Sequence, residues 1–66
     1  MNESILKGKW KQLKGNVKKQ WGELTDDDLD KVEGDAQILS GKIQEKYGKT
    51  KEEADREIRE FEKRQH

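Results

Sequence analysis

The sequence predicts an all-α fold of four short helices, arranged as two αα-hairpins that pack against each other with approximate internal duplication. Three observations support this fold class. Apolar residues recur at intervals of three and four positions, which is the spacing of one face of an α-helix. The 66 residues include no proline, so glycine is left as the main interruption of helices. An aromatic–glycine pair also occurs twice, 26 positions apart, within a longer repeated pattern.

The first helix is predicted over residues 4–21. Gly22 follows it, where a helix commonly ends on a residue with left-handed backbone. Gly8 and Gly15 point away from the apolar face, and two interpretations stay open for them. They permit close backbone approach at a second interface, or they keep a solvated face weakly helical. The apolar face itself consists of Leu6, Trp10, Leu13, Val17 and Trp21.

The second helix is predicted over residues 26–33 and the third over residues 35–47. Thr25 and Asp28 have the spacing of a capping box, in which a hydroxyl and a carboxylate satisfy the free amides of a helix start. Gly34 marks the join between the two helices, and one bent helix that continues through this join is the alternative. The apolar positions of the third helix are Ala36, Leu39, Ile43 and Tyr47.

The fourth helix is predicted over residues 51–64. Gly48 is expected to end the third helix with a left-handed backbone, and Thr50 with Glu53 repeats the capping-box spacing. The apolar positions of this helix are Ala54, Ile58 and Phe61.

The internal repeat divides one domain, residues 1–66, into half-repeats at about 5–33 and 34–64. The stretch that begins at Leu13 aligns with the stretch that begins at Leu39, and it includes both aromatic–glycine pairs, Trp21–Gly22 and Tyr47–Gly48. Each aromatic residue is therefore predicted as the last core residue of its helix. This position argues against either ring as a ligand-stacking residue.

Composition limits both the stability and the location of the protein. Hydrophobic residues make up 27%, well below the ~45–50% of ordinary globular chains, so the core is expected to be thin. There is no cysteine to form disulfides. No apolar run is long enough for a transmembrane span or a secretory signal, and we expect a cytoplasmic protein with no membrane insertion.

Charge is abundant but alternates in sign along the chain. Charged residues make up 45% and sum to zero. Successive blocks carry net charges of +5, −6, +3 and −2 over residues 1–22, 23–37, 38–51 and 52–66. Such alternation favours attraction between neighbouring helices over binding of one polyanion.

Four lysines form the candidate binding site. They step by four, three and four positions along the first helix, beside its apolar face. Such a stripe can contact nucleic-acid phosphates, a partner protein, or an anionic membrane surface with Trp10 and Trp21 inserted. Zero net charge and the acidic second and fourth helices favour a solvated face directed towards those helices, so nucleic acid is possible but not preferred. The lysine stripe consists of Lys7, Lys11, Lys14 and Lys18.

No pattern in the chain predicts catalysis, a cofactor or a metal. The single histidine, His66, is the terminal residue, where neither partners nor a rigid setting are expected. The aspartates from Asp26 onwards do not form a calcium loop, because Lys31 and Gln37 occupy the positions that need glycine and glutamate. We expect no enzyme and no small-molecule substrate, and a monomer or weak oligomer.

The segments "GKWKQLKG", "QWGELTDDD" and "GKIQEKYG" resemble the CsbD-like family of small bacterial general stress response proteins. The resemblance covers about residues 3–61. It implies two orthogonally packed α-hairpins, a bacterial cytoplasmic protein and no assigned biochemical activity. Some members are counted among the hydrophilins, a label that suits a mean hydropathy of −1.44 and six glycines.

These observations lead to two functional hypotheses. The first is a non-enzymatic, stress-induced hydrophilic protein that protects other proteins under osmotic stress, desiccation or general stress. The alternative is a small binding module that contacts nucleic acid or a partner protein through the lysine stripe.

Overall fold

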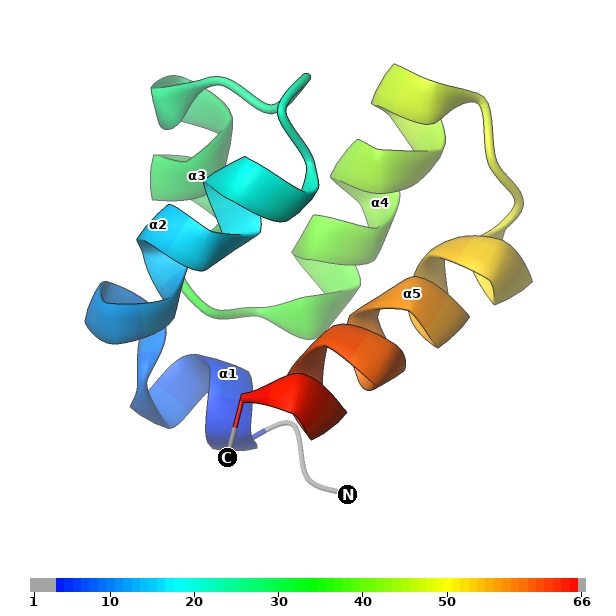
Figure 1. Cartoon of the computed structure of the whole chain (residues 1–66). Coiled ribbons are helices and arrows are strands. Elements are labelled where there is room, and N and C mark those ends of the chain that lie inside the picture. Colours follow the sequence, from blue (N-terminus) through cyan, green and yellow to red (C-terminus); the bar gives the residue numbers. More distant parts are fainter. Residues whose placement is uncertain (1–3, 66) are drawn as a thin grey trace.

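The computed structural model describes residues 4–65, and within them it contains five helices and no strand (Figure 1). The predicted all-α fold class is confirmed. The helices are α1 (Ser4–Gly8), α2 (Trp10–Gln20), α3 (Asp26–Val32), α4 (Ala36–Tyr47) and α5 (Lys51–Arg64).

The predicted first helix is divided into α1 and α2 by an interruption at Lys9. Lys9 has φ −118° and ψ 27°, outside the helical region, while its amide still donates to the carbonyl of Ile5 at 3.1 Å. The apolar face is kept across the break, because Leu6 on α1 is fully buried together with Val17 on α2. The interruption changes the direction of the chain without removing residues from the core.

The chain also turns sharply between α3 and α4, so the alternative of one bent continuous helix is wrong. Glu33 (φ 47°) and Gly34 (φ 81°) both adopt positive φ. Asp35 then caps α4, and its Oδ1 accepts from the amides of Gln37 at 2.9 Å and Ile38 at 3.3 Å.

Gly34 is needed here for close packing as well as for its backbone angles. A Cβ at this position would lie 2.8 Å from the Cα of Lys7 and 3.3 Å from the Cβ of Trp10. Any side chain would therefore push α1 and the start of α2 away from this turn. Gly34 thus allows the N-terminal helices to lie close to the turn between α3 and α4.

The two aromatic–glycine pairs end their helices in different ways. Gly48 is left-handed, with φ 65°, as predicted. The matching prediction for Gly22 is wrong, because only Gly34 and Gly48 have positive φ among the glycines of the described residues. Beyond α2 the amide of Leu24 instead donates to the carbonyl of Trp21 at 3.1 Å, and this turn buries Leu24 completely.

Both predicted threonine caps are present as complete capping boxes. Thr25 Oγ1 accepts from the amide of Asp28 at 3.0 Å, and Asp28 Oδ2 accepts from the amide of Thr25 at 3.0 Å. Thr50 and Glu53 make the equivalent pair of bonds at 3.0 and 3.1 Å. The sequence signals for the starts of α3 and α5 therefore have their expected physical origin.

One small core connects all five helices. Contacts join α4 to α5, α3 to α4, and α2 to both α1 and α3, and the end of α5 reaches α2 through a 3.2 Å hydrogen bond from Asn16 to Gln65. The pairing into hairpins and the half-repeats stay predictions. The buried apolar residues are Leu6, Leu13, Val17, Trp21, Leu24, Leu29, Val32, Leu39, Ile43, Ala54, Ile58 and Phe61.

Three glycines lie on exposed helix faces and have no packing role. A Cβ added at Gly8, Gly15 or Gly41 would meet no atom within 4 Å. The interpretation of close backbone approach is therefore wrong for Gly8 and Gly15 within this chain. They belong to solvated helix surface.

Candidate functional site

The lysine stripe lies on a strongly basic part of the molecule. Lys7 belongs to α1, and Lys11, Lys14 and Lys18 belong to α2. Residues 5–20 carry six lysines and no acidic residue. The contacts in the structure show which of these lysines are paired with other groups of the fold.

Half of the stripe is used to hold the fold together. Lys14 Nζ lies 2.9 Å from Asp30 Oδ1 on α3, and this hydrogen bond raises the pKa of Lys14. Lys18 Nζ donates to the carbonyl of Leu24 at 2.7 Å. Both contacts tie α2 to the segment that follows it.

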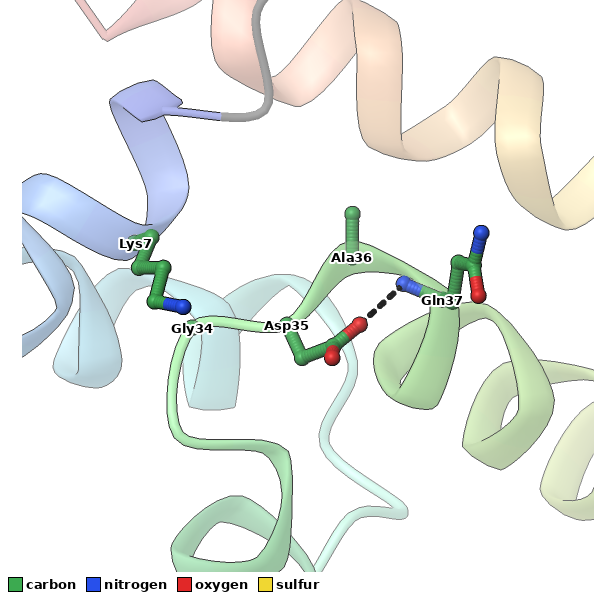
Figure 2. Close-up of a pocket in the computed structure, with 5 residues that line it drawn as sticks. All are labelled: Lys7, Gly34, Asp35, Ala36 and Gln37. Atoms are coloured by element: carbon green, nitrogen blue, oxygen red, sulfur yellow. Dashed lines mark hydrogen bonds between the residues drawn. The ribbon is translucent and has the colours of Figure 1, made fainter.

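The other half of the stripe is exposed and has no ion-pair partner among residues 4–65. Lys7 borders a shallow hollow between α1 and the start of α4, together with Gly34 and Asp35 (Figure 2). Figure 2 shows the Lys7 side chain extending towards this turn, where Asp35 already accepts a hydrogen bond from Gln37. Lys11 borders a second hollow at the junction of α1 and α2.

The structure adds a charge cluster centred on the buried Asp28, a residue that the sequence predicts only as part of a helix cap. Asp28 is 8% exposed, and its carboxylate lies 3.3 Å from both Lys42 Nζ and Lys46 Nζ of α4. The hydrogen bond from the Thr25 amide is the largest cause of a strongly lowered Asp28 pKa, and both lysines add to it. The available signal was the spacing of Lys42 and Lys46, which places both on one face of α4.

A second polar cluster links the two aromatic–glycine pairs. Trp21 Nε1 donates to Glu57 Oε1 at 2.9 Å, and Glu57 Oε2 pairs with Lys49. The pKa of Glu57 is lowered, first by Lys49 and also by Trp21. Tyr47 Oη accepts from the amide of Glu23, the residue after Gly22, at 3.0 Å. Trp21 in turn bonds to Glu57, which pairs with Lys49, the residue after Gly48.

The aromatic rings are packed rather than presented to a ligand. Trp21 is 2% exposed, and its ring centroid lies 5.3 Å from that of Phe61 at an interplanar angle of 55°. Tyr47 and Trp10 are half-buried against the core. The prediction of Trp21 as a core residue agrees with this packing.

The described residues contain no group of three or more His, Cys, Asp or Glu side chains that is placed to hold a metal ion. His66 lies outside the described residues. None of the helices in residues 4–65 has the length and apolar character required to cross a bilayer.

Comparison with known proteins places the chain in a family. The CsbD-like family model matches residues 5–56. A UPF0337 protein of Bordetella pertussis is 64% identical over 61 residues, which cover 92% of each chain. A UPF0337 protein of Pseudomonas aeruginosa is 56% identical over 61 residues, 92% of this chain and 94% of the relative.

A further relative comes from a third bacterial genus. The UPF0337 protein YjbJ of Escherichia coli K12 is 52% identical over 64 residues, 97% of this chain and 93% of the relative. No solved structure matches the chain. With a family model that spans most of its length and relatives that align almost end to end, the chain belongs to the CsbD-like family.

Proposed function

We propose that this protein acts without catalysis as a stress-induced protective protein, which keeps other proteins from aggregating in the bacterial cytoplasm when water is scarce. The observation that carries the proposal is the contrast between a small closed core and a surface of mixed charge. Ile5 at 37% and Ile38 at 42% are the large hydrophobic residues exposed among those the structure describes.

The surface chemistry suits a solute that stays dispersed while water is lost. Charged groups of both signs cover the surface, and the described residues present no large apolar patch through which two molecules could associate. Because the net charge is zero, the molecule approaches acidic and basic client proteins without strong repulsion. We expect it to act as a monomer or weak oligomer, with no small-molecule substrate.

The proposal is tested by drying and rehydrating an aggregation-prone client enzyme in the presence of the protein. We expect higher recovered activity and lower light scattering than with an equal mass of an inert globular protein. Equal recovery with the two additives would exclude the protective function.

A matched variant tests whether charge density is the cause. Replacing exposed charges by Gln in equal numbers of each sign keeps the net charge at zero while lowering the charge density. The expected result is unchanged helicity by circular dichroism with reduced protection. Suitable exposed positions are Lys11, Lys19, Lys63, Glu45, Glu52 and Glu60.

The alternative function, binding through the complete lysine stripe, is less well supported. Lys14 and Lys18 are already engaged with Asp30 and Leu24. Binding through all four lysines would have to break contacts that hold α2 to α3.

A further inference from the structure

We propose that Lys7, Lys9 and Lys11 form a binding site for the phosphate backbone of nucleic acid. These three residues are called the N-terminal basic patch below. The proposal is independent of the protective function. The patch shares Lys7 and Lys11 with the predicted stripe, adds Lys9, and leaves out Lys14 and Lys18.

The patch exists because α1 and α2 are separate helices. On one unbroken helix Lys9 would lie about 200° around the axis from Lys7, and it would face away from Lys11 as well. The interruption at Lys9 instead places all three lysines on the border of one hollow at the α1–α2 junction. This arrangement was not visible in the sequence pattern.

The three ammonium groups are available to a ligand. Each lysine is exposed, and none has an ion-pair partner within the described part of the chain. By contrast, the bases of α4 and the α4–α5 loop are neutralised, because Lys42 and Lys46 contact Asp28 and Lys49 contacts Glu57. The exposed Arg56, Arg59 and Lys63 lie among the six acidic residues of α5, whereas residues 5–20 contain no acidic residue.

The surroundings fit an extended polyanion. A Cβ at Gly8 would meet no atom within 4 Å, so the backbone between Lys7 and Lys9 is open to a phosphate. Trp10 borders the same hollow, but it is half-buried against the core and is not free to stack on a base. We therefore expect binding through phosphates, with little sequence preference.

An anionic membrane surface fits the same region less well. Interfacial helices bury a broad apolar face in the lipid boundary, whereas Leu13 and Val17 of α2 face the protein core. Ile5 is the exposed large apolar residue of the described α1–α2 segment, and α1 is only five residues long. The experiment must therefore distinguish lipid binding from nucleic-acid binding.

Glu33 provides an internal test of the site. It is the acidic residue that borders the hollow with the patch, at the left-handed position that ends α3. Its carboxylate opposes an incoming phosphate, so Glu33→Gln is expected to strengthen binding by about two- to threefold by removing one like charge.

The main experiment measures fluorescence anisotropy of a labelled oligothymidine of about twenty nucleotides, titrated with protein across a range of salt concentrations. The variant combines Lys7→Gln, Lys9→Gln and Lys11→Gln. We expect its affinity to fall at least tenfold at low salt, and the slope of log affinity against log salt to decrease by about 2, near 0.7 for each of three phosphate contacts.

A matched variant carries the same loss of charge elsewhere, through Lys19→Gln, Lys31→Gln and Lys63→Gln. We expect its affinity to change less than threefold, with circular dichroism confirming that both variants keep wild-type helicity. Equal weakening by the two variants would show general charge attraction and overturn the proposed site. Absence of oligothymidine binding by the wild type at low salt would also overturn it, as would patch-dependent binding to phosphatidylglycerol vesicles alone.

Discussion

The two aromatic–glycine pairs have nearly the same sequence but different local structures. Trp21–Gly22 leads into a five-residue connection between α2 and α3, whereas Tyr47–Gly48 leads into three residues between α4 and α5. In the longer connection Trp21 is 2% exposed and Gly22 is not left-handed. In the shorter one Tyr47 is half-buried and Gly48 has φ 65°.

Connection length explains the difference. With three residues the chain must reverse immediately, and a left-handed residue directly after the helix achieves this at low cost only with glycine. With five residues the turn is spread over Trp21 to Leu24, and it places Leu24 in the core with no exposed surface. A shared motif thus predicts where a helix ends, while the following residues decide how it ends.

The largest difference is expected between the two aromatic side chains. Trp21→Ala should lower the free energy of unfolding by about 3–5 kcal/mol, because it empties a buried site and removes the contact with Phe61. Tyr47→Ala should cost less, about 1–3 kcal/mol, because its ring is only half-buried.

Urea unfolding followed by circular dichroism at 222 nm measures both values. Since small domains have only about 5–15 kcal/mol of stability in total, Trp21→Ala is expected to lose a large share of it and to have the lower urea midpoint of the two variants. A greater loss for Tyr47→Ala would contradict the assignment of the first connection as the more deeply packed one.

The glycines should show the opposite order. Gly48→Ala is expected to cost about 1–2 kcal/mol, because alanine is strained in a left-handed conformation. Gly22→Ala should change the free energy of unfolding by less than about 0.5 kcal/mol, since the new Cβ would meet its nearest atom at 4.0 Å. Thermal melts of the two variants and the wild type measure the two losses of stability. Equal losses would show that connection length does not explain the difference between the two turns.

These two glycines also show how far the sequence predicts the fold. Helix periodicity and threonine caps gave the starts of α3 and α5, because both depend on residues close together in the chain. The conformation of Gly22 was not predictable in the same way, since it depends on Leu24 reaching the core. The close approach of Gly34 to Lys7 is another long-range feature, because these residues lie far apart in the chain.

The candidate site was predictable only in part for the same reason. The lysine stripe follows from spacing along one helix, and the sequence favoured a solvated lysine face directed towards the acidic helices. The sequence could not identify Asp30 as the partner of Lys14. It also could not show that the helix interruption at Lys9 places Lys9 beside Lys7. Both require knowing how α2 lies against α3 and how α1 turns away from it.

The two capping boxes should respond differently to acid. Asp28 in the first is buried and contacts Lys42 and Lys46, and its folded pKa is lowered. A lowered folded pKa stabilises the protein above the unfolded pKa of about 3.9, and this contribution is lost as the pH falls through and below that value. Glu53 in the second box is exposed and has no ion pair among residues 4–65.

Urea midpoints measured from about pH 7 down to pH 3 test this contrast. The wild type should lose stability mainly below about pH 5. Asp28→Asn should be less stable at neutral pH and should have a flatter profile, whereas Glu53→Gln should keep most of the wild-type slope. A wild-type slope in Asp28→Asn would assign the acid sensitivity to other carboxylates, among which Glu57 and Asp55 also have lowered pKa values.

A small gain in stability is expected at the matched glycines in the helix interiors, Gly15 in α2 and Gly41 in α4. Both are exposed and neither has an atom within 4 Å of an added Cβ. Alanine should therefore raise the free energy of unfolding by about 0.5–1 kcal/mol at each site, through its higher helix propensity. Urea unfolding of both variants checks the expected equality, and a loss at either site would mean that its surface is packed in solution.

The same two variants separate stability from protection. If the halves differ only where their helices end, Gly15→Ala and Gly41→Ala should stabilise the protein equally and leave recovery of the dried client enzyme unchanged. A more stable variant that protects less would show that weak helicity on the exposed faces is itself used in function, and that these glycines are kept at the expense of stability. That result would indicate that protection depends on local unfolding of α2 and α4 and not on surface charge. The two helices would then share this property in their interiors, although they end in different turns.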